Sequence, residues 1–399
     1  MTEDKATLVP QIRFRGFTDA WVQRKLGEGA EFSYGGGTPS TVNDEFWNGD
    51  IPWLQSSDLT EHNVTQVNLR KYITQKGLKC SAAKLVPAKS IAIVTRVGVG
   101  KLCIVPFQYT TSQDFLSLSK LNVDIWFGVY VIYKKLQGEL YSVQGTSIKG
   151  ITKEELLNKT INVPSSIPEQ TSIGNFIRAL DDTITLYKRK LDGLKELKKG
   201  YLQQMFPQAG ENEPRVRFAG FTKPWEQRKL GENAKVTMGQ SPDSINYTNN
   251  PNDHILVQGN ADMKNGKVVP RVYTTQITKT AQKGEIILSI RAPVGDVGKT
   301  DYNIVLGRGV AAINGNEFIY QTLIRIKEFG YWKKIIQGST FESINSNDLR
   351  EIVVFVPYPS EQITIGKFFR NFDEQITMHQ AKLDKLKKLK ESYLQKMFI

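Results

Sequence analysis

The amino-acid sequence predicts an α+β fold class: two mixed α/β domains joined by two long helices that form an intramolecular antiparallel coiled coil with pseudo-twofold symmetry. Two blocks of the chain each occur twice. Both copies of the longer block, residues 169–206 and 361–398, have the leucine spacing of a coiled coil. The stretches between the blocks contain short β-rich runs punctuated by Gly, Pro, Asn and Ser. A chain of 399 residues is long enough for two such domains, each with a core of its own.

The duplication is plain when the chain is compared with itself. Residues 10–28 (PQIRFRGFTDAWVQRKLGE) match residues 214–232 at 13 of 19 positions, with an offset of 204. Residues 169–206 match residues 361–398 at 21 of 38 positions, with an offset of 192. The offset falls by 12, so the second copy is about 12 residues shorter between its two blocks. The chain is therefore two versions of one plan.

The stretches between the repeated blocks diverge, and only short echoes connect them. GGTPS at 36–40 echoes GQSPDS at 239–244, and SQDFLSLS at 112–119 echoes GRGVAAIN at 307–314. We therefore expect two versions of one domain with different surfaces. The expected segments are domain 1 (1–168), a central helix (169–206), a linker (207–213), domain 2 (214–360) and a distal helix (361–399).

The 169–206 block and its copy contain no proline, and their apolar residues recur in a heptad pattern over about five heptads. Lys198, Lys390 and His379 fall on seam positions and make the pattern imperfect. Because length and pattern match, we expect the two helices to pair with each other. The alternative is two amphipathic helices that each lie on their own domain. The remaining expected seam residues are Ile177, Leu180, Ile184, Tyr187, Leu191, Leu194, Tyr201 and Met205, followed by Phe369, Phe372, Ile376, Leu383, Leu386, Tyr393 and Met397.

Charge and composition narrow the function. The net charge is +13 and the isoelectric point is about 9.4, an excess typical of proteins that bind nucleic acid. Two cysteines and three scattered histidines match neither a disulfide framework nor a zinc site, so a cytoplasmic protein without metal is expected. The first residues, MTEDKATLVP, do not resemble a signal peptide, and the longest apolar runs are strand-sized. No membrane association is expected.

Two motifs invite a catalytic interpretation, and neither supports one. GVGK at 98–101 lacks the first glycine and the final Ser or Thr of a phosphate-binding loop, and its echo at 292–299 indicates a shared strand and turn. Asp243, Asp262 and Lys264 fit a loose nuclease pattern, but domain 1 has no equivalent of the first acid and the lysine. The sequence also contains no evident methyl-donor loop, helicase-type ATP site or Ser-His-Asp set. We therefore expect no catalytic residues and no metal site.

The remaining signal is a set of polar residues at matched positions of the two domains. Arg96 and Arg291 precede glycine-containing turns, and arginine binds guanine or phosphate. Glutamine and asparagine suit adenine, and aspartate can accept a hydrogen bond from cytosine. For each residue alone, an ordinary surface role remains open. The candidate DNA-binding residues are Thr38, Ser40, Gln55, Ser57, Asp58, Arg96, Lys101 and Gln113 in domain 1, and Gln240, Ser241, Gln258, Asn260, Arg291, Lys299 and Arg308 in domain 2.

This organisation resembles the specificity subunit of type I restriction–modification systems over essentially the whole chain. The resemblance rests on the RFxGFTxxWxQRKLGE openings at 13–28 and 217–232, the GGTPS and MGQSP turns, the SQDF and GRGV strands, and the LDxLKxLKxxYLQxMF helices. The order of parts, a variable domain followed by a similar helix and then the same again, is more diagnostic than any one motif.

The resemblance implies a non-catalytic DNA-binding subunit in a phage-defence system. The two domains are then target recognition domains, each reading one half of a split, asymmetric DNA site. The helices act as a spacer and help to dock the modification subunits, which are expected to be two. The restriction or translocase subunits, also expected to be two, complete the enzyme. S-adenosylmethionine, ATP and Mg²⁺ are expected on those partner subunits, and no cofactor is expected in this chain.

Two other classes of function stay open at this point. One is an enzyme in its own right, either a nuclease or a methyltransferase. The other is a coiled-coil scaffold that binds no DNA. The lysines of the two helices are likewise open to several interpretations, with solvent and partner contacts favoured over DNA contacts.

Overall fold

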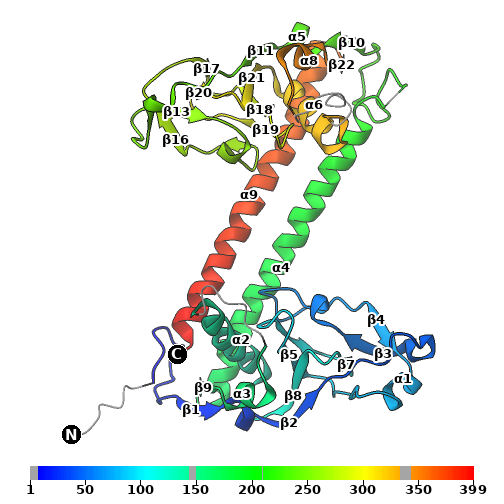
Figure 1. The fold of residues 1–399 in the computed structure, drawn as a ribbon, viewed down its shortest axis with the longest axis vertical. Helices are drawn as coiled ribbons and strands as arrows, with labels where there is room; N and C mark the ends of the chain where they lie inside the picture. The colour runs from blue at the N-terminus through cyan, green and yellow to red at the C-terminus, as the bar shows by residue number, and fades with distance from the viewer. Residues whose placement is uncertain (1–7, 143–149, 209, 333–342) are drawn as a thin grey trace. The chain divides into compact units, whose positions relative to one another are not determined.

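The computed structural model describes residues 8–142, 150–208, 210–332 and 343–399, which form two compact units (Figure 1). Unit 1 is Met1–Lys188 together with Lys382–Ile399, and unit 2 is Arg189–Ala381. The chain thus divides within its two long helices, α4 (Ile167–Gln204) and α9 (Pro359–Met397), and each helix contributes to both units. Residues 1–7, which begin the stretch judged not to be a signal peptide, and residue 209 of the expected linker lie outside the described residues.

Unit 1 contains a four-stranded antiparallel sheet in the order β2-β8-β5-β6 and a three-stranded sheet in the order β4-β3-β7, in which β3 and β7 run parallel. Strand β5 carries the run SIAIV and is buried along its whole length, as expected for a central strand. A separate pair, β1-β9, joins the start of the domain to its last strand. The elements are β1 (Val22–Lys25), η1 (Leu26–Gly29), β2 (Ala30–Gly35), η2 (Asp44–Phe46), β3 (Trp47–Leu54), η3 (Ser56–Asp58), β4 (Lys71–Ile73), α1 (Gln75–Lys79), β5 (Ser90–Val94), β6 (Leu102–Val105), β7 (Thr110–Thr111), β8 (Phe115–Leu121), α2 (Ile125–Ser142), α3 (Lys153–Asn158) and β9 (Thr160–Val163).

Among the described residues, unit 2 repeats this arrangement with four additional strands. Its sheets run β11-β21-β18-β19-β15-β14 and β12-β16-β13-β20-β17, and β10-β22 is the counterpart of β1-β9. The additional strands β12, β14, β15 and β17 are two or three residues long, too short to give a period in the sequence. The elements are β10 (Glu226–Lys229), α5 (Leu230–Asn233), β11 (Lys235–Met238), η4 (Ser244–Asn246), β12 (Tyr247–Thr248), β13 (His254–Val257), η5 (Asn260–Asp262), β14 (Met263–Lys264), β15 (Lys267–Val268), β16 (Val272–Thr274), β17 (Lys279–Ala281), β18 (Ile286–Ser289), β19 (Val297–Lys299), β20 (Ile304–Leu306), β21 (Val310–Asn314), α6 (Glu317–Glu328), α8 (Ser346–Glu351) and β22 (Val353–Val356).

The core of each unit includes the end of one long helix and the start of the other. In unit 1 the Phe398 ring, at the end of α9, stacks on Phe127 of α2 with 5.4 Å between ring centroids. In unit 2 the Phe206 ring, at the end of α4, stacks on Phe318 of α6 at 5.3 Å. All four rings are buried, and each contributes about 2–3 kcal/mol through the hydrophobic effect. The long helices are therefore integral parts of the domains.

The helices run antiparallel within each unit. In unit 1 the Phe176 ring contacts the Tyr393 ring at 4.9 Å, and one turn later Asp181 bonds Lys390. In unit 2 the Tyr201 ring contacts the Phe368 ring at 5.1 Å. No expected seam residue is exposed: Ile177, Leu191, Met205, Phe369, Leu383, Leu386 and Met397 are buried, and Leu180, Ile184, Tyr187, Leu194, Tyr201, Phe372, Ile376 and Tyr393 are partly buried.

Candidate nucleic-acid interface

Backbone hydrogen bonds gather four loops of unit 1 at one end of its sheets. The Gly37 amide donates to the Thr111 carbonyl at 2.9 Å, the Ser112 amide to the Leu54 carbonyl at 2.8 Å, and the Thr95 amide to the Asp114 carbonyl at 2.7 Å. The loops are those that carry Thr38, Gln55, Arg96 and Gln113, and we call these four residues loop cluster 1. The structure thus brings together four predicted site residues that span 76 positions of sequence.

Unit 2 gathers the corresponding loops with equivalent bonds. The Gln240 amide donates to the Leu306 carbonyl at 2.8 Å, the Gly307 amide to the Val257 carbonyl at 2.7 Å, and the Ile290 amide to the Gly309 carbonyl at 2.9 Å. The residues that these loops present are called loop cluster 2. They are Gln240, Ser241, Gln258, Arg291 and Arg308.

One pair of contacts shows how closely the clusters correspond. The Thr38 hydroxyl donates to the Gln113 side-chain carbonyl, and the Ser241 hydroxyl accepts from the Arg308 amide at 3.1 Å. The strand registers Gly35↔Leu116 and Met238↔Ala311 place these pairs at equivalent positions. Gln113 and Arg308 are both exposed there. The same place therefore presents a neutral amide in unit 1 and a cation in unit 2.

A glycine makes this close approach possible in each unit. A β-carbon added to Gly36 would lie 1.9 Å from the Ser112 carbonyl oxygen, and one added to Gly239 would lie 2.0 Å from the Gly307 carbonyl oxygen. Both distances are far inside van der Waals contact with backbone that cannot move aside. Gly36 and Gly239, the first residue of each sequence echo, are therefore packing requirements of the loop clusters.

Asp58 lies inside unit 1, which changes the interpretation of this predicted site residue. It is fully buried, and its Oδ2 accepts from the Gln55 amide at 3.0 Å. Burial raises the pKa of Asp58, against the opposing effects of that amide and of Arg70. Asp262 repeats the arrangement in unit 2, where its Oδ2 accepts from the Gln258 amide at 2.7 Å. Both carboxylates shape the loops that carry the two glutamines and are not presented to a ligand.

Two exposed arginines beside these carboxylates were not predicted from the sequence. Arg70 Nε lies 3.7 Å from Asp58 Oδ1, and Arg271 Nε lies 3.5 Å from Asp262 Oδ1, with both arginine side chains more than half exposed. The carboxylates hold the two cations at equivalent positions beside the loop clusters. The signal that would have found them is the echo of RKYITQ at 70–75 in RVYTTQ at 271–276.

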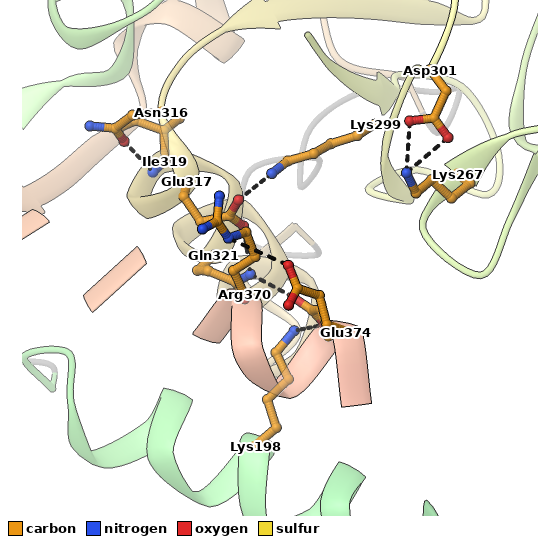
Figure 2. Close-up of polar contacts among 11 residues, drawn as sticks. Lys198, Lys267, Lys299, Asp301, Asn316, Glu317, Ile319, Gln321, Arg370 and Glu374 are labelled. Carbon is orange, nitrogen blue, oxygen red and sulfur yellow. Dashed lines mark hydrogen bonds and ion pairs between the residues drawn. The ribbon is translucent and has the colours of Figure 1, made fainter. Parts of the chain in front are cut away.

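The matching of Lys101 with Lys299 is wrong, because the two residues occupy different ends of the equivalent hairpins. The Val94 amide bonds the Lys101 carbonyl, whereas in unit 2 the same bond runs from Ser289 to Asp296. Lys299 instead pairs with Ile286 at the far end of β18. Its ammonium binds Glu317 (Figure 2). It also lies 4.4 Å from the Tyr320 ring centroid, so it is held within unit 2. Arg96 and Arg291 do occupy equivalent, exposed positions.

The remaining predicted residues lie near the clusters, and no contact among the described residues defines their role. Ser40 is exposed, and its carbonyl accepts from the Trp47 indole nitrogen at 3.0 Å. Ser57 is exposed on η3, and Asn260 is partly buried on η5.

The nuclease interpretation finds no support in the geometry. Asp262 is buried with its Oδ2 engaged by backbone, while Asp243 is exposed. Across residues 8–142, 150–208, 210–332 and 343–399, no group of three or more His, Cys, Asp or Glu side chains is placed to hold a metal ion. Within the same described ranges, no helix is long and apolar enough to cross a membrane.

Comparison with known proteins agrees with this arrangement. Residues 18–196 and 222–388 both match the type I restriction modification DNA specificity domain. The chain is 24% identical over 407 residues to the type I restriction enzyme MjaIX specificity subunit of Methanocaldococcus jannaschii, covering 94% of this chain and 92% of that one. It is 32% identical over 179 residues, 43% of each chain, to the EcoR124I/EcoR124II specificity subunit of Escherichia coli. The crystal structure of an S subunit from M. genitalium shares the fold, with a TM-score of 0.67 at 15% identity over 98% of this chain and 99% of that one.

Proposed function

Since the chain belongs to the family of type I restriction–modification specificity subunits and carries two DNA specificity domains, we propose that it is the non-catalytic DNA reader of such an enzyme. Loop cluster 1 reads one half of a bipartite, asymmetric target, and loop cluster 2 reads the other half. The paired helices set the gap between the half-sites and help to dock modification subunits. The partner subunits bind the cofactors: the modification subunits bind the methyl donor S-adenosylmethionine, and the restriction subunits bind ATP and Mg²⁺.

The observation that carries this proposal is the exchange of side chains on one scaffold. Equivalent loops present Thr38 and Gln113 in unit 1 but Ser241 and Arg308 in unit 2. An amide suits adenine and a guanidinium suits guanine, because each forms two hydrogen bonds with the base edge in the major groove. Two domains that share a fold but present different side chains are expected to recognise two different half-sites.

The charge of the chain supports a duplex as the ligand. The net charge of +13 attracts the phosphate backbone, and the exposed Arg70, Arg96, Arg271 and Arg291 lie at or beside the clusters. Each phosphate contact releases counterions, so binding should weaken steeply as salt concentration rises.

Exposed apolar side chains on the helices support partner docking. Leu186 and Met378 are 63% and 59% exposed, and Leu197 and Leu389 are 50% and 40% exposed. Each pair is related by the same offset of 192, so the duplication has kept an apolar residue in water at two places per helix. Two equivalent surfaces fit two copies of one partner, the modification subunit.

The decisive experiment maps DNA methylation by the complete enzyme in a host with and without this chain. We expect modified adenines within a split, non-palindromic sequence, with a fixed stretch of unspecified bases between its halves. Replacing residues 233–360 with the domain of a relative should change one half only. A contiguous palindromic target would contradict the proposal, and so would a complex without salt-dependent DNA affinity, which would favour the scaffold interpretation.

Docking is tested separately by co-purification of modification subunits. We expect Leu186→Asp and Met378→Asp to reduce the amount of bound modification subunit, because each places a charge on a surface that becomes buried. Val42→Asp is the matched control, since Val42 is 93% exposed and belongs to neither long helix. Equal losses in all three variants would argue against these helix faces as the docking site.

A further inference from the structure

An ion pair lies in the helix seam of each unit, where it is buried in unit 1 and partly buried in unit 2. Asp181 Oδ1 lies 2.5 Å from Lys390 Nζ in unit 1, and Asp373 Oδ1 lies 2.6 Å from Lys198 Nζ in unit 2. The offset of 192 relates Asp181 to Asp373 and Lys198 to Lys390, so the two pairs are copies of each other. The lysines that break the heptad pattern are therefore the partners of these carboxylates.

In unit 1 the carboxylate joins three elements. Asp181 on α4 bonds Lys390 on α9, and the Tyr130 hydroxyl on α2 donates to Asp181 Oδ2 at 2.7 Å. Lys390 also lies 5.6 Å from the Tyr130 ring centroid and 5.5 Å from that of Tyr133. The two charged side chains are only 6% and 8% exposed. Helix α2 of the recognition domain is thus hydrogen-bonded to α4 and in cation–π contact with α9 at one point.

Unit 2 makes the same joint with different chemistry and extends it. Gln321 on α6 donates from Nε2 to Asp373 Oδ2 at 2.8 Å and to Glu317 Oε1 at 3.1 Å. Glu317 in turn binds Lys299 at the end of β19, as Figure 2 shows. A continuous polar chain therefore runs from Lys198 on α4 through α9 and α6 to the sheet that carries loop cluster 2.

These pairs contribute orientation more than stability. A buried ion pair is often no more stabilising than an apolar pair of the same size, because both charges lose their water. Hydrogen bonds to a carboxylate depend on direction, whereas the hydrophobic effect does not. A polar residue at a seam position is also a known means of fixing helix register. Retaining the pair in both copies is therefore best explained by what it holds in place.

We propose that Asp181, Lys390, Lys198 and Asp373 are positioning residues whose polar joints, closed by Tyr130 and Gln321, fix each recognition domain on the helix pair and so restrict the enzyme to one gap length. The inference rests on the proposed function and identifies residues that set its geometry. A gap that is one base pair too long or too short displaces one half-site by about 3.4 Å and rotates it by about 34°, so rigid joints reject it at the cost of deforming the DNA.

The test uses the complex reconstituted with its modification subunits, and duplexes that carry the wild-type target with its native gap or a gap one base pair shorter or longer. We expect the wild type to prefer the native gap by about tenfold or more, from the cost of DNA deformation. The double variant Asp181→Leu with Lys390→Met should remain folded and lose most of this preference, while keeping its affinity for the native gap. Tyr130→Phe should lose part of it.

Lys388→Met is the control, because Lys388 is exposed on the same helix and should leave the gap preference unchanged. If the folded double variant keeps the wild-type preference, the inference is wrong although the proposed function stands. If the wild type itself needs no fixed gap, the proposed function fails, and this inference fails with it.

A second readout needs no DNA. Spin labels at Lys153 and Lys385, both exposed in unit 1, report the distance between the domain and the helix pair in a Cys80→Ser background. We expect one narrow distance distribution in the wild type and a broadened one in the double variant. An unchanged distribution would overturn the inference, and it would do so even if the double variant bound DNA poorly.

Discussion

Gln113 in unit 1 and Arg308 in unit 2 occupy the same place in the same loop, yet one ends in a neutral amide and the other in a guanidinium. The contacts behind them differ far less. Arg13 forms two hydrogen bonds with Glu169 at 2.7 and 2.8 Å, and Arg217 forms the same two with Glu361 at the same distances. At these positions the exposed loop residue has diverged, and the buried Arg–Glu pair has not.

The difference follows from the cost of each kind of change. Glu169 and Glu361 are each 1% exposed, so removing either arginine leaves an uncompensated buried charge. Replacing an exposed loop residue such as Gln113 costs the fold little, because water satisfies whatever takes its place. A duplicated domain can therefore change the ligand that its loops recognise while its buried contacts stay constant.

The largest expected effect comes from breaking one of the buried Arg–Glu pairs. Arg217→Ala should destabilise unit 2 by about 3 kcal/mol, at the lower end of the range for buried pairs because the arginine is 14% exposed. Arg13→Ala should have a similar effect on unit 1. Denaturant unfolding measures both. Arg228→Ala is the control, since its pair with Glu226 is exposed and its loss should change stability little. An equal loss in the control would contradict this account.

Exchanging the readers should move specificity between the units. We expect Arg308→Gln to alter the half-site read by unit 2 and leave the other half unchanged, and Gln113→Arg to do the reverse. The affected position should lose about 1–3 kcal/mol of discrimination, the value of one bidentate base contact. Methylation of duplex libraries randomised in one half-site measures the change. A uniform loss of affinity across all sequences would instead assign Arg308 to phosphate.

The equivalent buried tryptophans Trp21 and Trp225 differ in one hydrogen bond, and we expect a smaller effect from this difference. The Trp21 indole N–H donates to Glu169 at 3.3 Å, while that of Trp225 has no hydrogen-bond partner among the described residues. Both side chains are buried, so Phe should leave a similar cavity at each. We expect Trp21→Phe to cost about 1 kcal/mol more than Trp225→Phe, the typical value of one hydrogen bond. Equal losses in unfolding experiments would show that the bond contributes nothing.

The smallest effect is a change in pH dependence. Burial raises the pKa of Asp58 above its ordinary 3.8, so the folded state holds this proton more tightly than the unfolded state does. The stabilisation is present below that value and is lost as pH rises through the raised pKa. We expect Asp58→Asn to remove this loss of stability, so that the free energy of unfolding of the variant rises relative to that of the wild type as pH rises. Urea unfolding at a series of pH values measures it.

Glu155→Gln provides a control of opposite sign. The backbone amide and hydroxyl of Thr152 lower the pKa of Glu155 below its ordinary 4.5. Its stabilisation is present above that value and is lost as pH falls through the lowered pKa. The variant should therefore be less stable than the wild type at higher pH and equally stable in acid. If both variants shift in the same direction, burial is not what sets the behaviour of Asp58.

Local and repeated features were predictable from the sequence. The heptad predicted the long helices: α4 and α9 each begin two residues before the expected 169 and 361, and no predicted seam residue is exposed. The echoes GGTPS and GQSPDS predicted matched turns. Such features depend on neighbours within a few residues, so a single sequence window contains the signal.

The tertiary structure alone decided which distant residues meet. Asp58 has the residue type of a base reader, but burial beneath its own loop makes it a structural group. Lys101 and Lys299 share a Gly-Lys motif, yet strand register places them at different ends of their hairpins. Lys390 looked like a flaw in the heptad until Asp181, more than 200 residues away, proved to be its partner. Contacts across such separations depend on how the whole chain folds, and no local pattern records them.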